Sequence, residues 1–381
     1  MFAAIACARA TGWRKDVLVL EAGAGLLRKV KLSGGGRCNF THACSDVRTF
    51  AAHYPRGGKA LIGPLHRFGP AQTLAWFAGQ GIGHVCEPDG RVFPANESSQ
   101  TIVDALVHVA RAEGVQWRLH APVREVEARG GRFRLTLESG EPMECEKLLI
   151  ATGGEGNGEI LARMLGHTFI APVPSLFAFR IQEPWLRALA GLSLENVKAH
   201  IPGTRWQESG ALLATHWGLS GPVILKLSAW AARDLHDRAY RFPLEIDWLP
   251  NQPALAAPPA TRVQKSIPPG LPARLWDALL AVAEISPETR WSGLSKTATA
   301  RLQATLHHCR LTVTGKSPHR AEFVTCGGIP LEETDMKTCQ SRRVPGLYFA
   351  GELLNIDGLT GGFNLQAAWT TGWQAGTAMG I

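Results

Sequence analysis

Apolar side chains change their spacing along the chain, and each spacing predicts a different element. Residues 2–10 are apolar and mostly small, and Gly12 follows them, which predicts a closely packed helix ended by a glycine. Residues 17–20 are a run of Val and Leu, typical of a parallel strand buried on both faces. Helical spacing returns at 70–82 and 99–112. Alternating residues and turn signals predict hairpins at 88–90, 130–131 and 140.

The pattern changes in the second half and then returns to that of the opening. Short strand-like runs and one helix after Gly221-Pro222 fill residues 157–250, and strand alternation recurs at 309–325. A Pro/Ala-rich stretch and helical runs lie between them, at 251–308. A strand at 347–350 and a helix opening at Gly361-Gly362 follow. We therefore expect a discontinuous domain (1–156 and 326–381), an inserted mostly β domain (157–250 and 309–325) and a helical subdomain (251–308).

Composition narrows the class of protein. The chain has 381 residues, 45% of them hydrophobic, which suffices for two or more cores. No apolar run approaches the roughly 20 residues that span a bilayer, and no signal peptide is evident. Eight scattered cysteines without a C-x-x-C pair predict reduced thiols, no metal site and a cytoplasmic location. The net charge of +8 attracts anions, but without a dense Lys/Arg run we do not expect a nucleic-acid partner.

Glu21 stands at the carboxyl end of the first predicted strand. In dinucleotide-binding folds an acid at this place hydrogen-bonds the adenosine ribose, about 20 residues after a G-x-G-x-x-G turn. Counting back from Glu21 puts that turn at or before residue 1. The simpler alternative is that any buried strand can end in a glutamate.

A glycine-rich, cationic loop is predicted at 28–42. The run Ser-Gly-Gly-Gly-Arg-Cys-Asn at 33–39 exposes backbone N–H groups and lets a ligand approach the main chain. Positive and neutral polar side chains suited to a pyrophosphate surround it, namely Arg28, Lys29, Lys31, Arg37, Ser33, Asn39 and Thr41. The alternative is a flexible surface loop.

Two further glycine turns follow predicted strands. Thr152-Gly153-Gly154 comes directly after the strand at 148–151, at the edge where a parallel sheet meets a dinucleotide. Gly361-Gly362 opens the last helix, whose first N–H groups attract negative charge. The N–H groups of 362–364 could face the pyrimidine side of a flavin and stabilise the anionic reduced ring. A plain glycine turn before a packing helix is the alternative.

Together these segments resemble one family. "KLSGGGRCNFTH", "LLIATGG", "THWGLSGPVILKLS" and "GLYFAGELLNIDGLTGGFNLQAAWTTG" look like the BaiN-like or YhiN-like (aminoacetone oxidase-like) FAD-dependent oxidoreductases. The resemblance implies an α/β fold, with a glutathione-reductase-like, Rossmann-type FAD-binding domain split by an inserted β-barrel that carries a helical subdomain. It also implies non-covalent FAD.

Carried over residue by residue, the resemblance assigns the cofactor contacts. Glu21 would bind the adenosine ribose, near Arg28 and Lys29. The residues that would line FAD along its length are Ser33, Gly34, Gly35, Gly36, Arg37, Cys38 and Asn39. The adenine and adenosine half would meet the Val123 backbone, Thr152, Gly153 and Gly154. Gly351 and Glu352 would meet the ribityl-pyrophosphate, and the isoalloxazine would meet Asp357, Gly361, Gly362, Phe363 and Asn364.

The chain departs from the family at its start, where the family has a strand and a G-x-G-x-x-G turn. Roughly a dozen residues are involved. That strand is central in a Rossmann-type sheet, so its loss leaves unpaired backbone groups costing about 1–3 kcal/mol each. One expectation is that the chain is an N-terminally truncated form of a longer protein. The other is a natural short form with impaired FAD binding.

The resemblance implies hydride transfer between flavin N5 and an unidentified small molecule, in a reductase linked to NADH or NADPH or in an oxidase. No second G-x-G-x-x-G is evident, so a nicotinamide would be a transient co-substrate. Cys38 has no second cysteine two or three residues away, so we reject a disulfide-reductase mechanism and interpret it as a packing thiol. A tRNA- or RNA-linked flavoprotein is the alternative. The sequence assigns neither a catalytic acid or base nor an oligomeric state.

Overall fold

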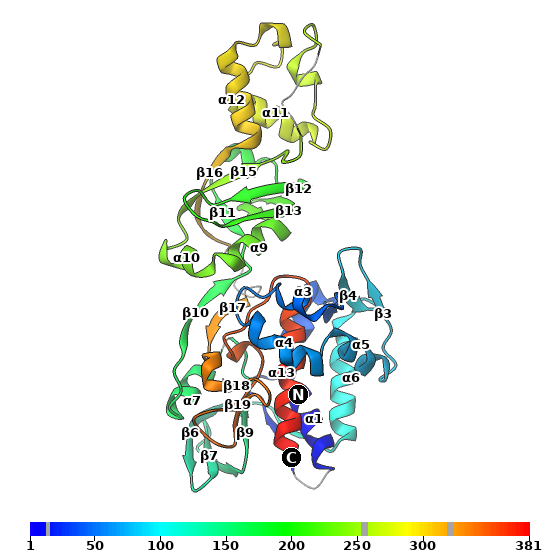
Figure 1. Ribbon diagram of the computed structural model, residues 1–381, viewed down its shortest axis with the longest axis vertical. Coiled ribbons are helices and arrows are strands. Elements are labelled where there is room, and N and C mark those ends of the chain that lie inside the picture. The colour runs from blue at the N-terminus through cyan, green and yellow to red at the C-terminus, as the bar shows by residue number, and fades with distance from the viewer. Residues whose placement is uncertain (13–15, 155, 253–257, 318–323) are drawn as a thin grey trace. The chain divides into compact units, whose positions relative to one another are not determined.

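The computed structural model describes residues 1–12, 16–154, 156–252, 258–317 and 324–381. The chain divides into two compact units, 1–173 with 324–381, and 174–323 (Figure 1). The first is a mixed α/β unit, and the second contains a closed six-stranded barrel. The expected fold class, α/β with an inserted β-barrel, is confirmed.

Helix packing joins the two ends of the chain in the first unit. α1 (Phe2–Thr11) lies along α13 (Phe363–Gly380) (Figure 1). A Cβ on Gly376 would come 2.9 Å from the carbonyl carbon of Ala3, so the glycine permits the close approach of the two helices. Gly12 ends α1 with φ 56°, as its position in the sequence predicts.

Parallel strand pairs form the centre of this unit. β1 (Leu18–Leu20) pairs with β5 (Gln116–Arg118). β9 (Leu148–Ile150) pairs with β20 (Leu347–Phe349), so strands from both ends of the sequence share one sheet. β19 (Gln340–Ser341) and β18 (Thr334–Asp335) extend that sheet. Within the described residues, no strand hydrogen-bonds the β1–β5 pair to it.

The other elements of the first unit agree with the hydrophobic pattern. α5 (Pro70–Ala78) and α6 (Ser99–Ala112) occupy the two helical stretches. The three expected hairpin turns join antiparallel strands: β3 (His84–Cys86), β4 (Arg91–Pro94), β6 (Val123–Arg129), β7 (Arg132–Leu137) and β8 (Pro142–Cys145). The remaining elements are α2 (Arg28–Leu32), η1 (Ser33–Gly36), β2 (Thr41–His42), α3 (Val47–Ala51), α4 (Gly58–Arg67) and α7 (Gly158–Met164).

The second unit is built on the barrel. Its strand order is β11 (Phe179–Ile181), β14 (Gly218–Ser220), β13 (Gln207–Thr215), β12 (Ser193–His200), β15 (Phe242–Asp247) and β16 (Cys309–Lys316). α9 (Pro222–Trp230) begins after Gly221-Pro222 as expected and packs on β13. The other helices are α8 (Pro184–Arg187), α10 (Ala232–Asp237), α11 (Ala273–Val282) and α12 (Lys296–His307). Trp276 and Trp248 are fully buried in the core of this unit.

Two strands carry the chain out to the insert and back. β10 (Ile170–Ser175) and β17 (Val324–Gly328) pair with each other. Parts of two sequence predictions lie outside the described residues: 253–257 of the Pro/Ala-rich stretch and 318–323 of the strand alternation. No helix among the described residues is long and apolar enough to cross a membrane.

Candidate functional site

The glycine run at 33–36 is an open stretch of main chain. Gly34, Gly35 and Gly36 have φ of 58°, 66° and 89°, a conformation that favours glycine. A Cβ on Gly35 or Gly36 would meet nothing within 4 Å, so that face of the run is clear. The segment before it, which the sequence predicted as a loop, is partly helical, because Arg28–Leu32 form α2.

Cys38 is buried at the end of this run. Its φ is 60°, and its N–H donates to the Ser33 carbonyl at 3.0 Å. Burial raises the pKa of its thiol to about 11, so the side chain is a neutral thiol near pH 7. A neutral buried thiol supports the interpretation of Cys38 as a packing residue.

The glycine-rich segment lies directly against the start of α13. Gly362 has φ 89°, and a Cβ there would come 2.6 Å from the carbonyl carbon of Thr41 and 2.8 Å from Oδ1 of Asn39. The Thr41 hydroxyl donates to Oε1 of Gln366 at 2.6 Å in a buried hydrogen bond. The predicted segments 33–39 and 361–364, more than 300 positions apart in the sequence, are therefore neighbours in space.

Buried polar contacts hold the turn that precedes α13. Asp357 is fully buried and forms an ion pair with Arg56, with Nε 2.5 Å from Oδ1. The Asn364 side chain accepts from the N–H of Gly358 at 2.8 Å and donates to its carbonyl at 2.9 Å. The first N–H groups of α13 have no partner inside the helix, so the turn presents fixed donors.

Two neighbouring histidines, whose ring centroids are 6.0 Å apart, pack against Phe363 at this helix start. The rings of His42 and His53 stack on the Phe363 ring, with centroids 4.8 and 4.5 Å away. The Tyr54 hydroxyl donates to the Phe363 carbonyl at 2.6 Å and holds the backbone of this residue in place. Sequence reasoning missed both histidines, although His42 ends the segment "KLSGGGRCNFTH" and could have been flagged by its position.

The hydrogen bonds of the two imidazoles fix different tautomers. Nδ1 of His42 accepts from the Cys44 N–H, so its proton is on Nε2, which donates to the Asp89 carbonyl at 3.1 Å. Nδ1 of His53 donates to the Thr49 carbonyl at 2.9 Å. Its Nε2 has no hydrogen-bond partner within the described residues, and the ring is half-buried. Both ring nitrogens of His42 are used, whereas His53 keeps one available for a proton.

Three predicted segments meet at the other end of the glycine run. Nζ of Lys29 lies 2.7 Å from Oε2 of Glu352 in an ion pair. A Cβ on Gly153 would come 3.8 Å from the same oxygen. Oε1 of Glu21 accepts from the Gly23 N–H at 2.7 Å, and Arg28 is exposed.

Arg37, which the sequence also predicts to contact the cofactor, has partners that orient its side chain away from the glycine run. Arg37 pairs with Glu87 at 2.7 Å and with Glu97, and its guanidinium lies 4.0 Å above the Phe93 ring. These contacts direct its charge toward the β3–β4 hairpin.

The strand-end residues that the sequence predicts for the adenosine half pack against neighbouring residues of the protein. The Val123 carbonyl accepts from Nδ2 of Asn157. A Cβ on Gly154 would come 2.5 Å from Cβ of Thr325, and Thr152 packs against Gly158 in the same way. Gly351 has φ 69°, and its N–H donates to the Thr371 hydroxyl at 3.0 Å.

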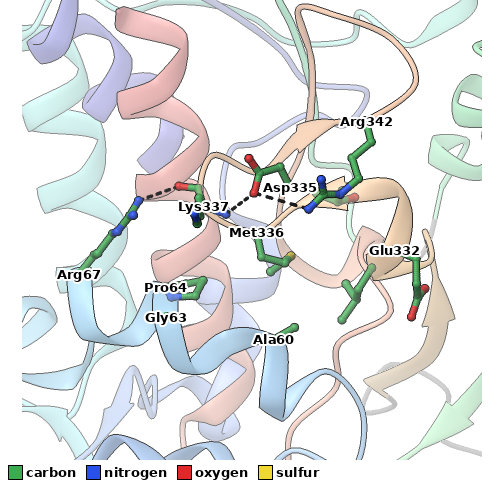
Figure 2. A pocket seen from close by; sticks show the side chains of 11 residues that line it. Ala60, Gly63, Pro64, Arg67, Glu332, Asp335, Met336, Lys337 and Arg342 are labelled. Carbon is green, nitrogen blue, oxygen red and sulfur yellow. Dashed lines mark hydrogen bonds and ion pairs between the residues drawn. The ribbon is translucent and has the colours of Figure 1, made fainter.

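A cavity of about 510 Å³ lies between α4 and the segment 331–342 (Figure 2). Arg67 donates to the Lys337 carbonyl at 3.0 Å at its edge, and Arg342 approaches Asp335 at 3.8 Å. None of the residues that line it is among those predicted to bind the cofactor. This cavity is therefore not the expected cofactor site, and the surface formed by the glycine run and the start of α13 is the stronger candidate for it.

The residues present fit an extended dinucleotide. Gly35 and Gly36 offer an open main-chain face, α13 offers helix-start donors, and Lys29 supplies a cation at the other end of the glycine run. The glycine at 362 cannot be replaced without a clash, so this geometry is fixed by packing.

Comparison with known proteins agrees with this geometry. A family model described as the HI0933-like protein Rossmann domain matches residues 1–378. A ribosomal RNA dihydrouridine synthase of Escherichia coli is 31% identical over 94% of this chain and 90% of its own length. A 3-dehydro-bile acid delta(4,6)-reductase of Clostridium scindens is 26% identical over 99% of this chain and 95% of its own.

A solved structure has the same fold. The 3-ketosteroid-delta4-(5alpha)-dehydrogenase of Rhodococcus jostii RHA1 is 15% identical and superposes with a TM-score of 0.51, over 100% of this chain and 94% of its own. The predicted family and enzyme class are confirmed. The chain belongs to the HI0933-like Rossmann family of FAD-dependent oxidoreductases.

Proposed function

We propose that the protein reduces a carbon–carbon double bond conjugated to a carbonyl group, with FAD as cofactor and NADH or NADPH as electron donor. The observation that carries this proposal is that two relatives, which match 94% and 99% of this chain, have names that both imply reduction of a carbon–carbon double bond. Dihydrouridine is uridine with two hydrogens added across C5–C6, next to the C4 carbonyl. A 3-oxo delta(4,6) steroid has the same arrangement. Both reactions add a hydride to the β carbon and a proton to the α carbon.

The chain's own residues would hold the cofactor as follows. The Lys29–Glu352 pair and Glu21 would bind the ribose and pyrophosphate region, and the open face of Gly35 and Gly36 would lie along the cofactor. The first N–H groups of α13 would face the pyrimidine end and favour negative charge there. Bound FAD would supply hydride transfer through its N5.

We assign the delivery of this proton to His53. Its Nδ1–H donates to the Thr49 carbonyl, so Nε2 must first take up a proton from solvent before it can donate one, and Nε2 has no hydrogen-bond partner within the described residues. The ring is held 4.5 Å from that of Phe363, at the end of the site where the isoalloxazine is expected. His42 has both nitrogens engaged and would act by packing against Phe363 beside His53.

Uridine in ribosomal RNA is the first substrate to test, because two relatives at 30–31% identity carry that name. The absence of a dense Lys/Arg run argued against a nucleic-acid partner, and these names argue for one. A small-molecule enone is the second candidate, supported by the bile-acid reductase.

The test is reduction by the purified full chain supplied with FAD and NADPH or NADH. Ribosomal RNA transcribed in vitro contains no dihydrouridine, and its conversion is measured by mass spectrometry of nucleosides. A 3-oxo-Δ4 steroid serves as the small-molecule arm. Dihydrouridine that depends on both the cofactor and the nicotinamide supports the RNA substrate. Reduction of the steroid alone supports the enone, and reduction of neither substrate contradicts the proposal.

A further inference from the structure

Positive charge is concentrated in the inserted unit. Residues 174–323 contain 17 Lys and Arg against 11 Asp and Glu, a net charge of +6 out of +8 for the whole chain. The charges are dispersed in the sequence, so no basic run marks them. A unit of 150 residues that carries most of the excess charge is a candidate for an anionic partner.

Part of this charge lies next to aromatic rings along α10. Trp206, in the turn between β12 and β13, donates from Nε1 to the carboxylate of Asp234 on α10. The Arg205 guanidinium lies 4.5 Å from the Trp206 ring centroid. At the other end of α10, Nζ of Lys316 lies 4.3 Å above the ring of Tyr240.

The turn after α10 presents further arginines. Arg238 and Arg241 are exposed, as is Arg205, and none of the three has a carboxylate partner within the described residues. Between them Ala239 and Tyr240 have φ of 51° and 59°, two successive non-glycine residues in the left-handed region. Such strain persists only where the surroundings over-determine it, and it clusters at functional sites.

We infer that this surface, defined by Arg205, Trp206, Arg238, Tyr240 and Arg241, docks single-stranded RNA. Exposed guanidinium groups bind phosphates, and the half-buried Trp206 ring, with the Arg205 guanidinium 4.5 Å from its centroid, supplies an aromatic surface against which an unstacked base can stack. The partner is single-stranded because a base can stack on an aromatic side chain or be modified by an enzyme only when it is outside the duplex stack. This inference rests on the proposed RNA substrate, and it gives the inserted unit its role.

The test measures binding without turnover. The full chain is titrated into a fluorescein-labelled, uridine-rich RNA of about 16 nucleotides at several salt concentrations between about 50 and 200 mM. The variant combines Arg205→Ser, Arg238→Ser and Arg241→Ser. Three lost phosphate contacts, each worth roughly 0.7 in the slope of log K against log salt, lower that slope by about 2. Affinity falls roughly 50-fold at about 0.15 M salt.

A matched control removes the same charge elsewhere in this unit. Lys265, Arg290 and Lys296 are exposed, and in the part of the chain that the structure describes none has a carboxylate partner. They belong to the helical part with α11 and α12, at the other end of the unit from α10 (Figure 1). Their triple replacement by serine should keep the affinity within a few-fold of the unmodified protein.

Trp206→Leu gives a second, uncharged perturbation, with an expected loss of about 5- to 150-fold from stacking. Circular dichroism before each titration excludes unfolded variants. If both triple variants lose the same affinity for RNA, the effect is one of net charge and the inference is overturned. Unchanged binding by the variant that lacks Arg205, Arg238 and Arg241 would also overturn it. Binding requires neither FAD nor nicotinamide, so a chain that docks RNA through this surface but makes no dihydrouridine refutes the proposed function alone.

Discussion

Replacing Gly362 by alanine tests the contact between the glycine-rich segment and the last helix. The backbone at 362 has φ 89°, which costs an alanine about 1–2 kcal/mol. The new methyl group would also lie 2.6 Å from the carbonyl carbon of Thr41 and overlap its oxygen. Overpacking of this kind costs about 1–3 kcal/mol, so we expect Gly362→Ala to destabilise the first unit by about 2–5 kcal/mol.

Gly35→Ala is the matched control. Its φ of 66° imposes a similar backbone cost, but its methyl group meets nothing within 4 Å. We expect a loss of about 1–2 kcal/mol from strain alone. If FAD lies along that open face, the same methyl group should weaken FAD binding by far more than its effect on stability suggests.

The assay is hydrogen exchange of the amides of 363–380 in flavin-free protein, followed by mass spectrometry, because it reports on α13 without the second unit. The free energy of opening should fall by about 1–3 kcal/mol more for Gly362→Ala than for Gly35→Ala. Equal values within about 0.5 kcal/mol would refute the close packing of 362 against 39–41.

Three further predictions concern buried or catalytic groups. Asp357→Asn removes the buried carboxylate of the ion pair with Arg56 and should destabilise the first unit by about 3–5 kcal/mol in urea unfolding, whereas replacing Arg56 by Met and Asp357 by Leu together should cost less; a larger loss in the double variant would contradict this. Burial lowers the pKa of His167 below 6.5 despite its hydrogen bond with Glu333, so the unfolded chain takes up a proton before the folded protein does as the pH falls. The free energy of unfolding should therefore decrease below about pH 6.5, by up to about 1.4 kcal/mol per pH unit. His167→Gln should reduce this pH dependence, and an unchanged dependence would show that His167 is not its cause. His53→Gln should lower substrate reduction about 10²- to 10⁴-fold in single-turnover kinetics while flavin reduction by NADPH stays unchanged, and equal slowing of both steps would deny it the role of proton donor.

Elements whose pattern is local were readable from the sequence. α6 and α13 have helical spacing, and the turns at 90, 130–131 and 140 carry the glycines that their φ values require. α2 was missed because its residues 28–32 adjoin the glycine run, and their composition suggested a cationic loop. The spacing of hydrophobic residues is not enough to identify a five-residue helix that is followed directly by three glycines.

The contacts that complete the site could not be predicted, because they join distant positions. Arg56 and Asp357 are 301 residues apart, and neither belongs to a motif that names the other. The role of His53 depends on which nitrogen the Thr49 carbonyl engages, which only coordinates reveal. The excess positive charge of the inserted unit can be counted from the sequence. That Arg205 lies beside α10 depends on the fold and could not be predicted.

The central claim is that the glycine-rich segment 33–39 and the helix start at 362–364 hold one FAD between them. A crystal structure of the protein with FAD tests it most directly. The account predicts the pyrimidine ring of the flavin about 3 Å from the first N–H groups of α13, with the rest of the cofactor along the open face of Gly35 and Gly36. Density for the flavin in the cavity between α4 and 331–342, or anywhere away from these two segments, would contradict it.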